Sequence, residues 1–186
     1  MHFLKVLKFI IKKRYITLLN KLGYDMDYLK RIIKKDIVRV TVTYINYEGV
    51  TCRGNIYVHE LISDKVSSIF KDMYVQRFPI RSIYNSDGVD DSFLIKNNFT
   101  SAFNFRYVNN TKRLSNHAFG MAVDINPKAN PATPSSFKDL YDTTITMGVI
   151  DDSIIDLFKR HGFLWGGEIF GNFIDRHHFE YRIKYQ

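Results

Sequence analysis

Two side chains of metal-binding type lie close together in the segment SNHAFGMAVD (115–124). His117 is followed seven residues later by Asp124, with Gly120 between them. A glycine lets the chain turn, and the alternation of a following strand would place Ala122 and Asp124 on the same face. The imidazole and the carboxylate could then meet at one point. A His–Asp hydrogen bond with a purely structural role is common, so this segment alone leaves both interpretations open.

A second segment, DRHHFE (175–180), combines an acid with two histidines. Two imidazoles and one carboxylate with an open fourth position form a catalytic zinc site, and a further carboxylate can take a proton from water there. Neighbouring strand residues face opposite sides, so only one histidine can be a ligand. The three-residue spacing from Asp175 favours His178, and His177 is expected at the rim or facing solvent.

A third segment, GFLWGGE (162–168), contains the only tryptophan of the chain. Two glycines after Trp165 predict a tight bend beside a groove, with the indole as one wall. Glu168 is either a second carboxylate of the site or an exposed loop acid. The segment HELIS (59–63) begins like the helical zinc motif H-E-x-x-H, but a serine stands in place of the second histidine, so no metal site is expected there.

Taken together, SNHAFGMAVDIN and DRHHFEY match the patterns S-x-H-x-x-G-x-A-x-D and D/E-x-x-H-F-E. By these motifs the chain resembles the D-alanyl-D-alanine carboxypeptidase family of zinc peptidases, which includes VanY-type and VanX-type enzymes and phage L-alanyl-D-glutamate endolysins. HGFLWGGE, NNFTSAFNFR and TKRLSNH are similar to the endolysin-like branch. The resemblance covers roughly residues 38–182.

The resemblance implies a role for each matching residue. A single zinc ion would be held by three ligands: His117, Asp124 and His178. Asp175 would be the catalytic base, and Arg106 is the best match for the arginine that stabilises the developing oxyanion. Ser115 corresponds to a substrate-contacting serine, and Trp165 and Glu168 complete the expected substrate-binding residues.

The implied reaction is zinc-dependent hydrolysis of a peptide bond in bacterial peptidoglycan stem peptides, of the D,D-carboxypeptidase or the L-Ala-D-Glu endopeptidase type. The implied location is the cell-wall side, periplasmic or extracellular. The alternative is a catalytically inactive, zinc-containing module that binds cell wall or protein, since Hedgehog signalling domains share this fold and zinc triad. The acid at Asp175 and the WGGE segment favour a hydrolase.

The elements that must position these residues predict an α+β fold of the Hedgehog/DD-peptidase-like kind, with a small antiparallel sheet carrying the zinc site and helices packed on it. Apolar spacing predicts helices at residues 3–20, 26–36, 60–75 and 153–160. Alternation of β-branched residues predicts strands at 38–46, 53–58, 121–126 and 173–183. Residues 84–112 and 127–136 are expected to be loops, and loops often carry function.

The formal charge of +8 is concentrated near the start of the chain. Residues 1–40 contain eleven Lys or Arg and three Asp, whereas the remainder is balanced. This predicts a basic helical segment at 1–36 and a catalytic domain at 37–186. The basic segment either contacts an anionic polymer or forms a solvated helical face. No pattern indicates nucleic-acid binding.

Other features limit the class of protein further. The single cysteine, Cys52, excludes an internal disulfide. No apolar run approaches the roughly 20 residues of a membrane-spanning helix, and the lysines near the start interrupt any signal-peptide core. A monomer is expected.

Overall fold

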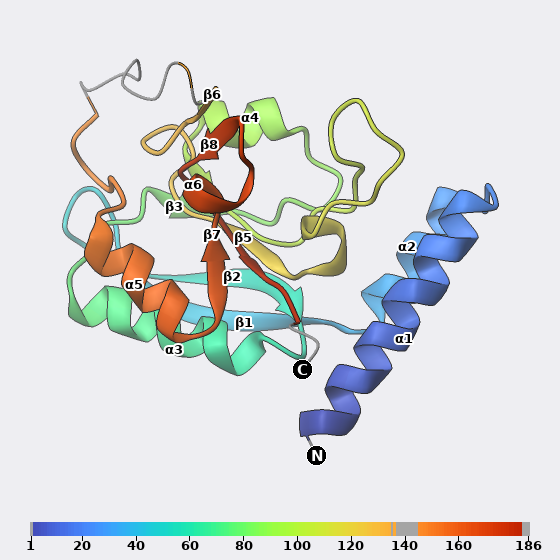
Figure 1. The fold of residues 1–186 in the computed structure, drawn as a ribbon. Coiled ribbons are helices and arrows are strands. Elements are labelled where there is room, and N and C mark those ends of the chain that lie inside the picture. Colours follow the sequence, from blue (N-terminus) through green and yellow to red (C-terminus); the bar gives the residue numbers. More distant parts are fainter. Residues whose placement is uncertain (1, 135, 137–144, 184–186) are drawn as a thin grey trace.

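The computed structural model describes residues 2–134, 136 and 145–183 of the chain. These residues form a mixed arrangement of helices and small sheets (Figure 1), so the predicted mixture of α and β structure is confirmed. The helices are α1 (His2–Lys21), α2 (Met26–Lys34), α3 (Ser63–Val75), α4 (Asp91–Lys96), the 3-10 turn η1 (His117–Phe119), α5 (Asp152–Arg160) and α6 (Gly166–Ile169). The strands are β1 (Ile37–Ile45), β2 (Thr51–His59), β3 (Ser82–Ile83), β4 (Phe99–Thr100), β5 (Ala122–Asp124), β6 (Ala132–Pro134), β7 (Phe163–Trp165), β8 (Phe173–Asp175) and β9 (His178–Tyr181).

The strands pair mostly in antiparallel fashion. β1 and β2 form a long hairpin, and β5, β9 and β7 form a three-stranded antiparallel sheet with β9 in the middle. β6 pairs with β8 in antiparallel register, and the short strands β3 and β4 pair in parallel. β9 therefore lies between the strand that carries Asp124 and the strand that carries Trp165.

Helices α3 and α5 supply much of the core. α3 packs against β1, α5 packs against β7, and the two helices contact each other (Figure 1). The Phe158 ring of α5 stacks on Phe179 of β9 at a centroid distance of 3.8 Å, and it meets Phe163 edge-on at 5.6 Å. These rings are fully buried, so the sheet turns one face toward the aromatic core. The opposite face is left for polar side chains.

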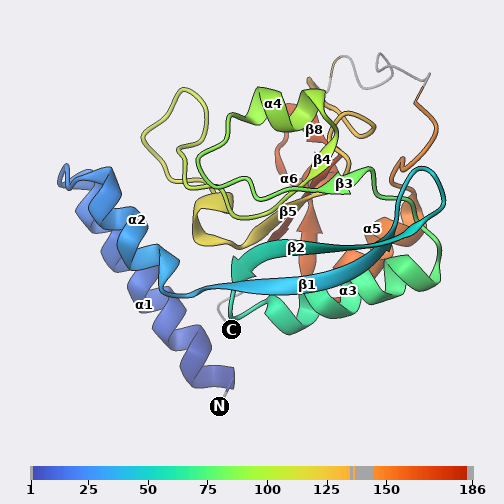
Figure 2. The ribbon, with the colours of Figure 1, turned by 180° about the vertical axis from the view of Figure 1, so that it is seen from behind.

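The basic N-terminal segment forms α1 and α2, which contact each other at one edge of the molecule (Figure 2). Phe9, Ile16 and Leu19 of α1 are buried in the same hydrophobic cluster as the rest of the core. The Phe9 ring meets the His59 imidazole edge-on at 4.8 Å. α1 is therefore packed onto the body of the protein. Among the described residues, no helix combines the length and the hydrophobicity that crossing a bilayer requires.

Four predicted elements differ from those observed. The helix expected at 60–75 begins at Ser63, because the Leu61 amide donates to His59 Nδ1 and the Glu60 amide to the Asp36 carbonyl. The region 84–112, expected to be a loop, contains α4 and β4; α4 is capped by Asp90, whose carboxylate accepts from the Ser92 amide at 2.7 Å.

The strand expected at 173–183 consists of β8 and β9, because the chain leaves the pairing with β6 and joins β5 and β7. The loop expected at 127–136 contains β6, and residue 135 lies outside the described residues.

Candidate metal centre

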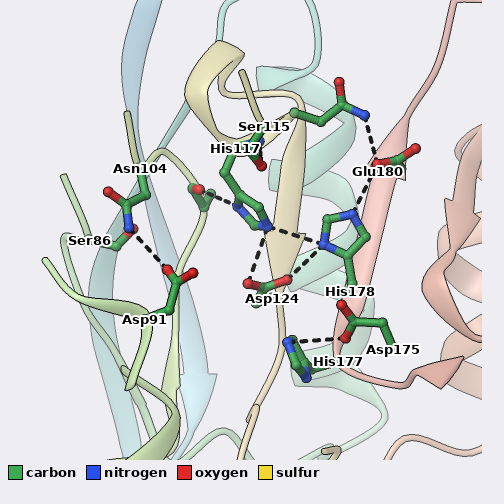
Figure 3. Close-up of polar contacts among 12 residues, drawn as sticks. Ser86, Asp91, Asn104, Ser115, His117, Asp124, Asp175, His177, His178 and Glu180 are labelled. Atoms are coloured by element: carbon green, nitrogen blue, oxygen red, sulfur yellow. Dashed lines mark hydrogen bonds and ion pairs between the residues drawn. The ribbon is translucent and has the colours of Figure 1, made fainter. Parts of the chain in front are cut away.

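The register of β5 against β9 places Asp124 directly opposite His178, and Ala122 opposite Glu180. Since side chains alternate along a strand, Asp124, His178 and Glu180 emerge on the same face of the sheet. Phe179, on the other face, is completely buried in the core. Because Phe179 stands between His178 and Glu180 and enters the core, the side chains of His178 and Glu180 both point to the opposite face of the sheet (Figure 3).

The third donor comes from η1, immediately before β5. His117 begins this 3-10 turn, which ends at Gly120 in the left-handed conformation with φ of +64°. A Cβ at this glycine would lie 2.7 Å from the His59 amide nitrogen, so only glycine fits here. The tight turn brings the buried His117 ring back over the start of β5.

The donor atoms of these three residues form a compact triangle. His117 Nε2 lies 3.1 Å from His178 Nδ1 and 3.2 Å from Asp124 Oδ2, and His178 Nδ1 lies 3.0 Å from Asp124 Oδ1. Ligands about 2.0–2.1 Å from a tetrahedral zinc ion lie roughly 3.3 Å from one another. Within the part of the chain that the structure describes, this is the one set of three metal-ligating side chains that converge. The residues present therefore fit a zinc ion.

The outer nitrogens of both imidazoles are held by acceptors. His117 Nδ1 donates to the Ala102 carbonyl at 2.6 Å, and His178 Nε2 donates to Glu180 Oε2 at 3.1 Å. A nitrogen that donates carries the hydrogen, so His117 Nε2 and His178 Nδ1 are the ring nitrogens whose lone pairs face the triangle once its proton is displaced. Metal-binding imidazoles are usually fixed in this way by a carbonyl or carboxylate. Both tautomers are thus set for binding a cation.

The charges around the triangle shift its pKa values strongly. Burial lowers the pKa of His178, but hydrogen bonds to Asp124 and Glu180 outweigh burial and raise it to about 10. Burial raises the pKa of Asp124, yet the imidazoles beside it hold that pKa well below its usual value. Burial also opposes ionisation of Glu180, whose hydrogen bonds to His178 and Asn116 nevertheless lower its pKa to about 2. The metal-free centre therefore holds an imidazolium between two carboxylates.

Asp175 ends β8 and borders the same cavity as the donor triangle. Its Oδ1 lies 3.1 Å from His177 Nε2, and His177 Nδ1 donates to the Asn130 carbonyl at 2.7 Å. The prediction that His177 lies at the rim or faces solvent is wrong, since the residue is 7% exposed. Residues 176 and 177 form the turn between β8 and β9, so strand alternation does not apply to them. His177 instead lies buried against the Asp175 carboxylate (Figure 3).

Gly166, the first residue of α6, is needed for this arrangement. A Cβ at this position would lie 2.4 Å from the Asp175 carbonyl oxygen and 3.0 Å from the His178 Cβ. α6 can therefore lie directly against the turn that carries both residues only if position 166 has no side chain. The tight bend predicted from the two glycines corresponds to this contact.

Arg106 and Ser115 also line the cavity. Arg106 Nε pairs with Asp91 Oδ1 at 2.9 Å, and Asp91 accepts from Asn104 Nδ2 at 3.3 Å. The ion pair with Asp91 thus fixes the orientation of the Arg106 guanidinium. Ser115 Oγ accepts from the His117 amide at 3.2 Å, so this serine stabilises the turn that presents the first donor.

Trp165 and Glu168 lie outside the residues that line this cavity. The Trp165 indole donates to the Arg176 carbonyl at 2.9 Å, and its ring lies over Gly167. Glu168 forms an exposed ion pair with Lys159 at 2.7 Å. Glu168 is thus an exposed acid, as in one of the two interpretations left open by the sequence, but it lies on α6 and not in a loop.

Two adjoining cavities, of about 420 and 560 Å³, meet at the donor triangle. Both are lined by Arg106, Asp124, Asp175, His177 and Phe170. The first also contains cationic side chains from three arginines: Arg106, Arg113 and Arg182. The second is lined by apolar side chains that include Leu94, Pro127 and Phe173.

Three residues to which the sequence analysis assigned no role, Glu180, Asn116 and Lys13, are linked to the donor triangle by hydrogen bonds. Asn116 Nδ2 donates to Glu180 Oε2 at 2.7 Å, and Lys13 Nζ donates to Asn116 Oδ1 at 3.1 Å. Burial lowers the pKa of Lys13, against the attraction of Glu180. A chain of hydrogen bonds thus runs from α1 to the donor His178. The available signal for Glu180 was its position two residues after His178, on the same face of a strand.

Comparisons with known proteins agree with the motifs. Residues 109–181 match the model of a family described as D-alanyl-D-alanine carboxypeptidase. The matched segment contains the three donors and Asp175, whereas Arg106 precedes it. No curated protein and no solved structure gave a match.

Proposed function

We propose that this chain, whose residues 109–181 match the model of a family described as D-alanyl-D-alanine carboxypeptidase, is a zinc-dependent peptidase acting on the stem peptides of bacterial peptidoglycan. The observation that carries the proposal is the donor triangle, in which one ring nitrogen of each histidine and the Asp124 carboxylate converge on the same point. One zinc ion would be held by His117, Asp124 and His178. When bound, zinc polarises a carbonyl and makes water a nucleophile near neutral pH.

Asp175 is the proposed general base and later the general acid. One of its oxygens faces His177, which leaves Oδ2 available to accept a proton from the attacking water and to return it to the leaving amine. Proton transfer by a positioned side chain contributes about 10²–10⁴-fold to a rate. The carboxylate borders the cavity next to the donors, as this role requires.

Arg106 is the proposed electrostatic partner of the tetrahedral intermediate. Its ion pair with Asp91 orients the guanidinium without filling the cavity. A well-placed donor to an oxyanion is worth roughly 3–4 kcal/mol of transition-state stabilisation. Arg113 and Arg182 add positive charge that suits the carboxylates of a stem peptide.

The place of action we propose is the cell-wall side, where this substrate occurs. The donor set alone is equally compatible with a D,D-carboxypeptidase and an L-Ala-D-Glu endopeptidase, because both reactions need the same groups. The identity of the products distinguishes them.

The test is digestion of purified peptidoglycan by the zinc-loaded protein, with and without a chelator, followed by labelling of new amino termini and mass spectrometry. We expect new termini that disappear with the chelator and return with zinc. Asp175→Asn should lower the rate by about 100-fold or more while zinc stays bound. Asp152→Asn, an exposed acid in the first turn of α5, is the matched control and should leave the rate unchanged. A zinc-loaded wild type that releases no fragments would instead favour the binding module.

A further inference from the structure

Helix α1 carries apolar side chains on two opposite faces. One face, with Phe9, Ile16 and Leu19, is buried against the body of the protein. The other is exposed along the whole length of the helix and consists of Leu4, Leu7, Ile11, Tyr15 and Leu18, with Leu22 directly after the helix; we call these six residues the outer stripe. At about 100° per residue, these six side chains fall within an arc of roughly 80°. Leu4, Ile11 and Leu18 are 67%, 60% and 54% exposed, respectively.

Cations border the outer stripe on both sides. Lys8 lies beside it on one edge, and Arg14 and Lys21 lie on the other, all three exposed. The helix sequence, HFLKVLKFIIKKRYITLLNK, contains no Asp or Glu. A continuous apolar stripe flanked by cations, on a helix without any acid, is a feature of helices that lie in the plane of an anionic lipid surface.

A cavity of about 460 Å³ lies beside the outer stripe and is also lined by apolar and cationic side chains. Its lining combines the apolar Leu18 and Tyr181 with the cations Arg14, Lys21 and Arg182. Long basic side chains can bury their stems along apolar surface while their charged ends stay at the headgroup level. The edge of the outer stripe can therefore make apolar contacts with acyl chains and charged contacts with headgroups.

We propose that the outer stripe of α1 docks this protein on the surface of a bilayer that contains anionic lipids. The leucines and Ile11 enter the boundary between headgroups and acyl chains, and Lys8, Arg14 and Lys21 contact the headgroups. An anionic polymer would pair with the cations but would leave six large apolar side chains in water. A second copy packed on the same stripe would bring the cations of the two helices together without an acid on α1 to pair with them.

The same helix also contacts the metal centre from its inner side, through Lys13 and Asn116. Docking through the outer stripe would therefore hold the catalytic cavity at a fixed height above the membrane. Lipid binding itself needs neither metal nor substrate, so it is measured independently of peptidase activity.

The test is co-sedimentation of the full chain with vesicles of phosphatidylglycerol and phosphatidylcholine in equal parts, and with vesicles of phosphatidylcholine alone. We expect binding to the mixed vesicles that weakens as salt is raised, and much weaker binding to the neutral ones. The double variant Ile11→Glu/Leu18→Glu should bind the mixed vesicles at least about tenfold more weakly. Lys8→Gln/Lys21→Gln should lose about fivefold per cation.

Val75→Glu is the matched control, because Val75 is 71% exposed on α3 and far from the stripe in sequence; it should bind like the wild type. Circular dichroism and hydrolysis of soluble fragments check that each variant is folded. The proposal is overturned if both vesicle types bind equally, or if the Ile11→Glu/Leu18→Glu variant binds as well as the wild type. A wild-type dimer in analytical ultracentrifugation that the same variant converts to monomer would also overturn it, since a second copy would then cover the stripe.

Discussion

Binding of zinc should release about one proton per ion at pH 6. The fixed tautomers place a hydrogen on His117 Nδ1 and on His178 Nε2, both outside the donor triangle. The raised pKa of His178, about 10, means that one further proton occupies the triangle in the metal-free protein. Asp124 contributes none, since its pKa is well below the usual value. A cation at the triangle must displace that single proton.

The same proton sets how zinc affinity changes with pH. Below a pKa of about 10 for His178, each pH unit should strengthen apparent zinc binding about tenfold. The metal-free fold should show the opposite trend. Because the folded pKa is raised above the unfolded value of 6.5, protonated His178 stabilises the fold fully below about pH 6.5, and this stabilisation is lost as the pH rises through about 10.

Isothermal titration calorimetry in two buffers of different ionisation enthalpy measures the proton count, and competition with a chromophoric chelator measures the affinity. Glu180→Gln removes one of the carboxylates that raise the pKa of His178. Zinc binding to this variant should therefore release fewer protons at pH 8 than zinc binding to the wild type. Glu48→Gln, an exposed acid beside a turn, should behave like the wild type. Zinc binding that releases no proton at pH 6 and has a pH-independent affinity would refute the deduced protonation of the centre.

Two further substitutions test how the centre is supported. Gly166→Ala should lower the free energy of unfolding by about 1–3 kcal/mol in urea titrations, because its Cβ would overlap the Asp175 carbonyl; unchanged stability would show that α6 moves away freely. Lys13→Met should weaken zinc binding by up to about tenfold in chelator competition, because it breaks the hydrogen bond that holds Asn116. Lys8→Met, on the exposed side of the same helix, is its control; equal affinities in the two variants would contradict the chain of hydrogen bonds from α1.

The sequence was most informative where strand alternation and a glycine turn act locally. Asp124 could be expected to point away from the core because its neighbours Val123 and Ile125 are apolar, and the structure pairs it in register with His178. The mixture of α and β structure followed from the same patterns. Alternation could not predict which distant strands pair, because a periodic pattern specifies only which face of each strand is buried.

The predictions that the structure contradicts have identifiable physical causes. His177 was misplaced because alternation was applied across a turn, where backbone direction changes between β8 and β9. The elements α4 and β4 were missed because six and two residues are too short for a periodic signal. Lys13 acts through a contact with Asn116, far from it in the chain, and such contacts leave no mark in local spacing.

We propose that three side chains, from η1, β5 and β9, together bind one zinc ion. This proposal is tested most directly by a crystal structure of the zinc-loaded protein with anomalous data collected at the zinc edge. We expect one strong anomalous peak about 2.0–2.2 Å from His117 Nε2, His178 Nδ1 and an Asp124 oxygen, with the Asp175 carboxylate beside the open position. A triangle that stays without an anomalous peak in the presence of excess zinc, or a peak bound by other residues, would contradict the account.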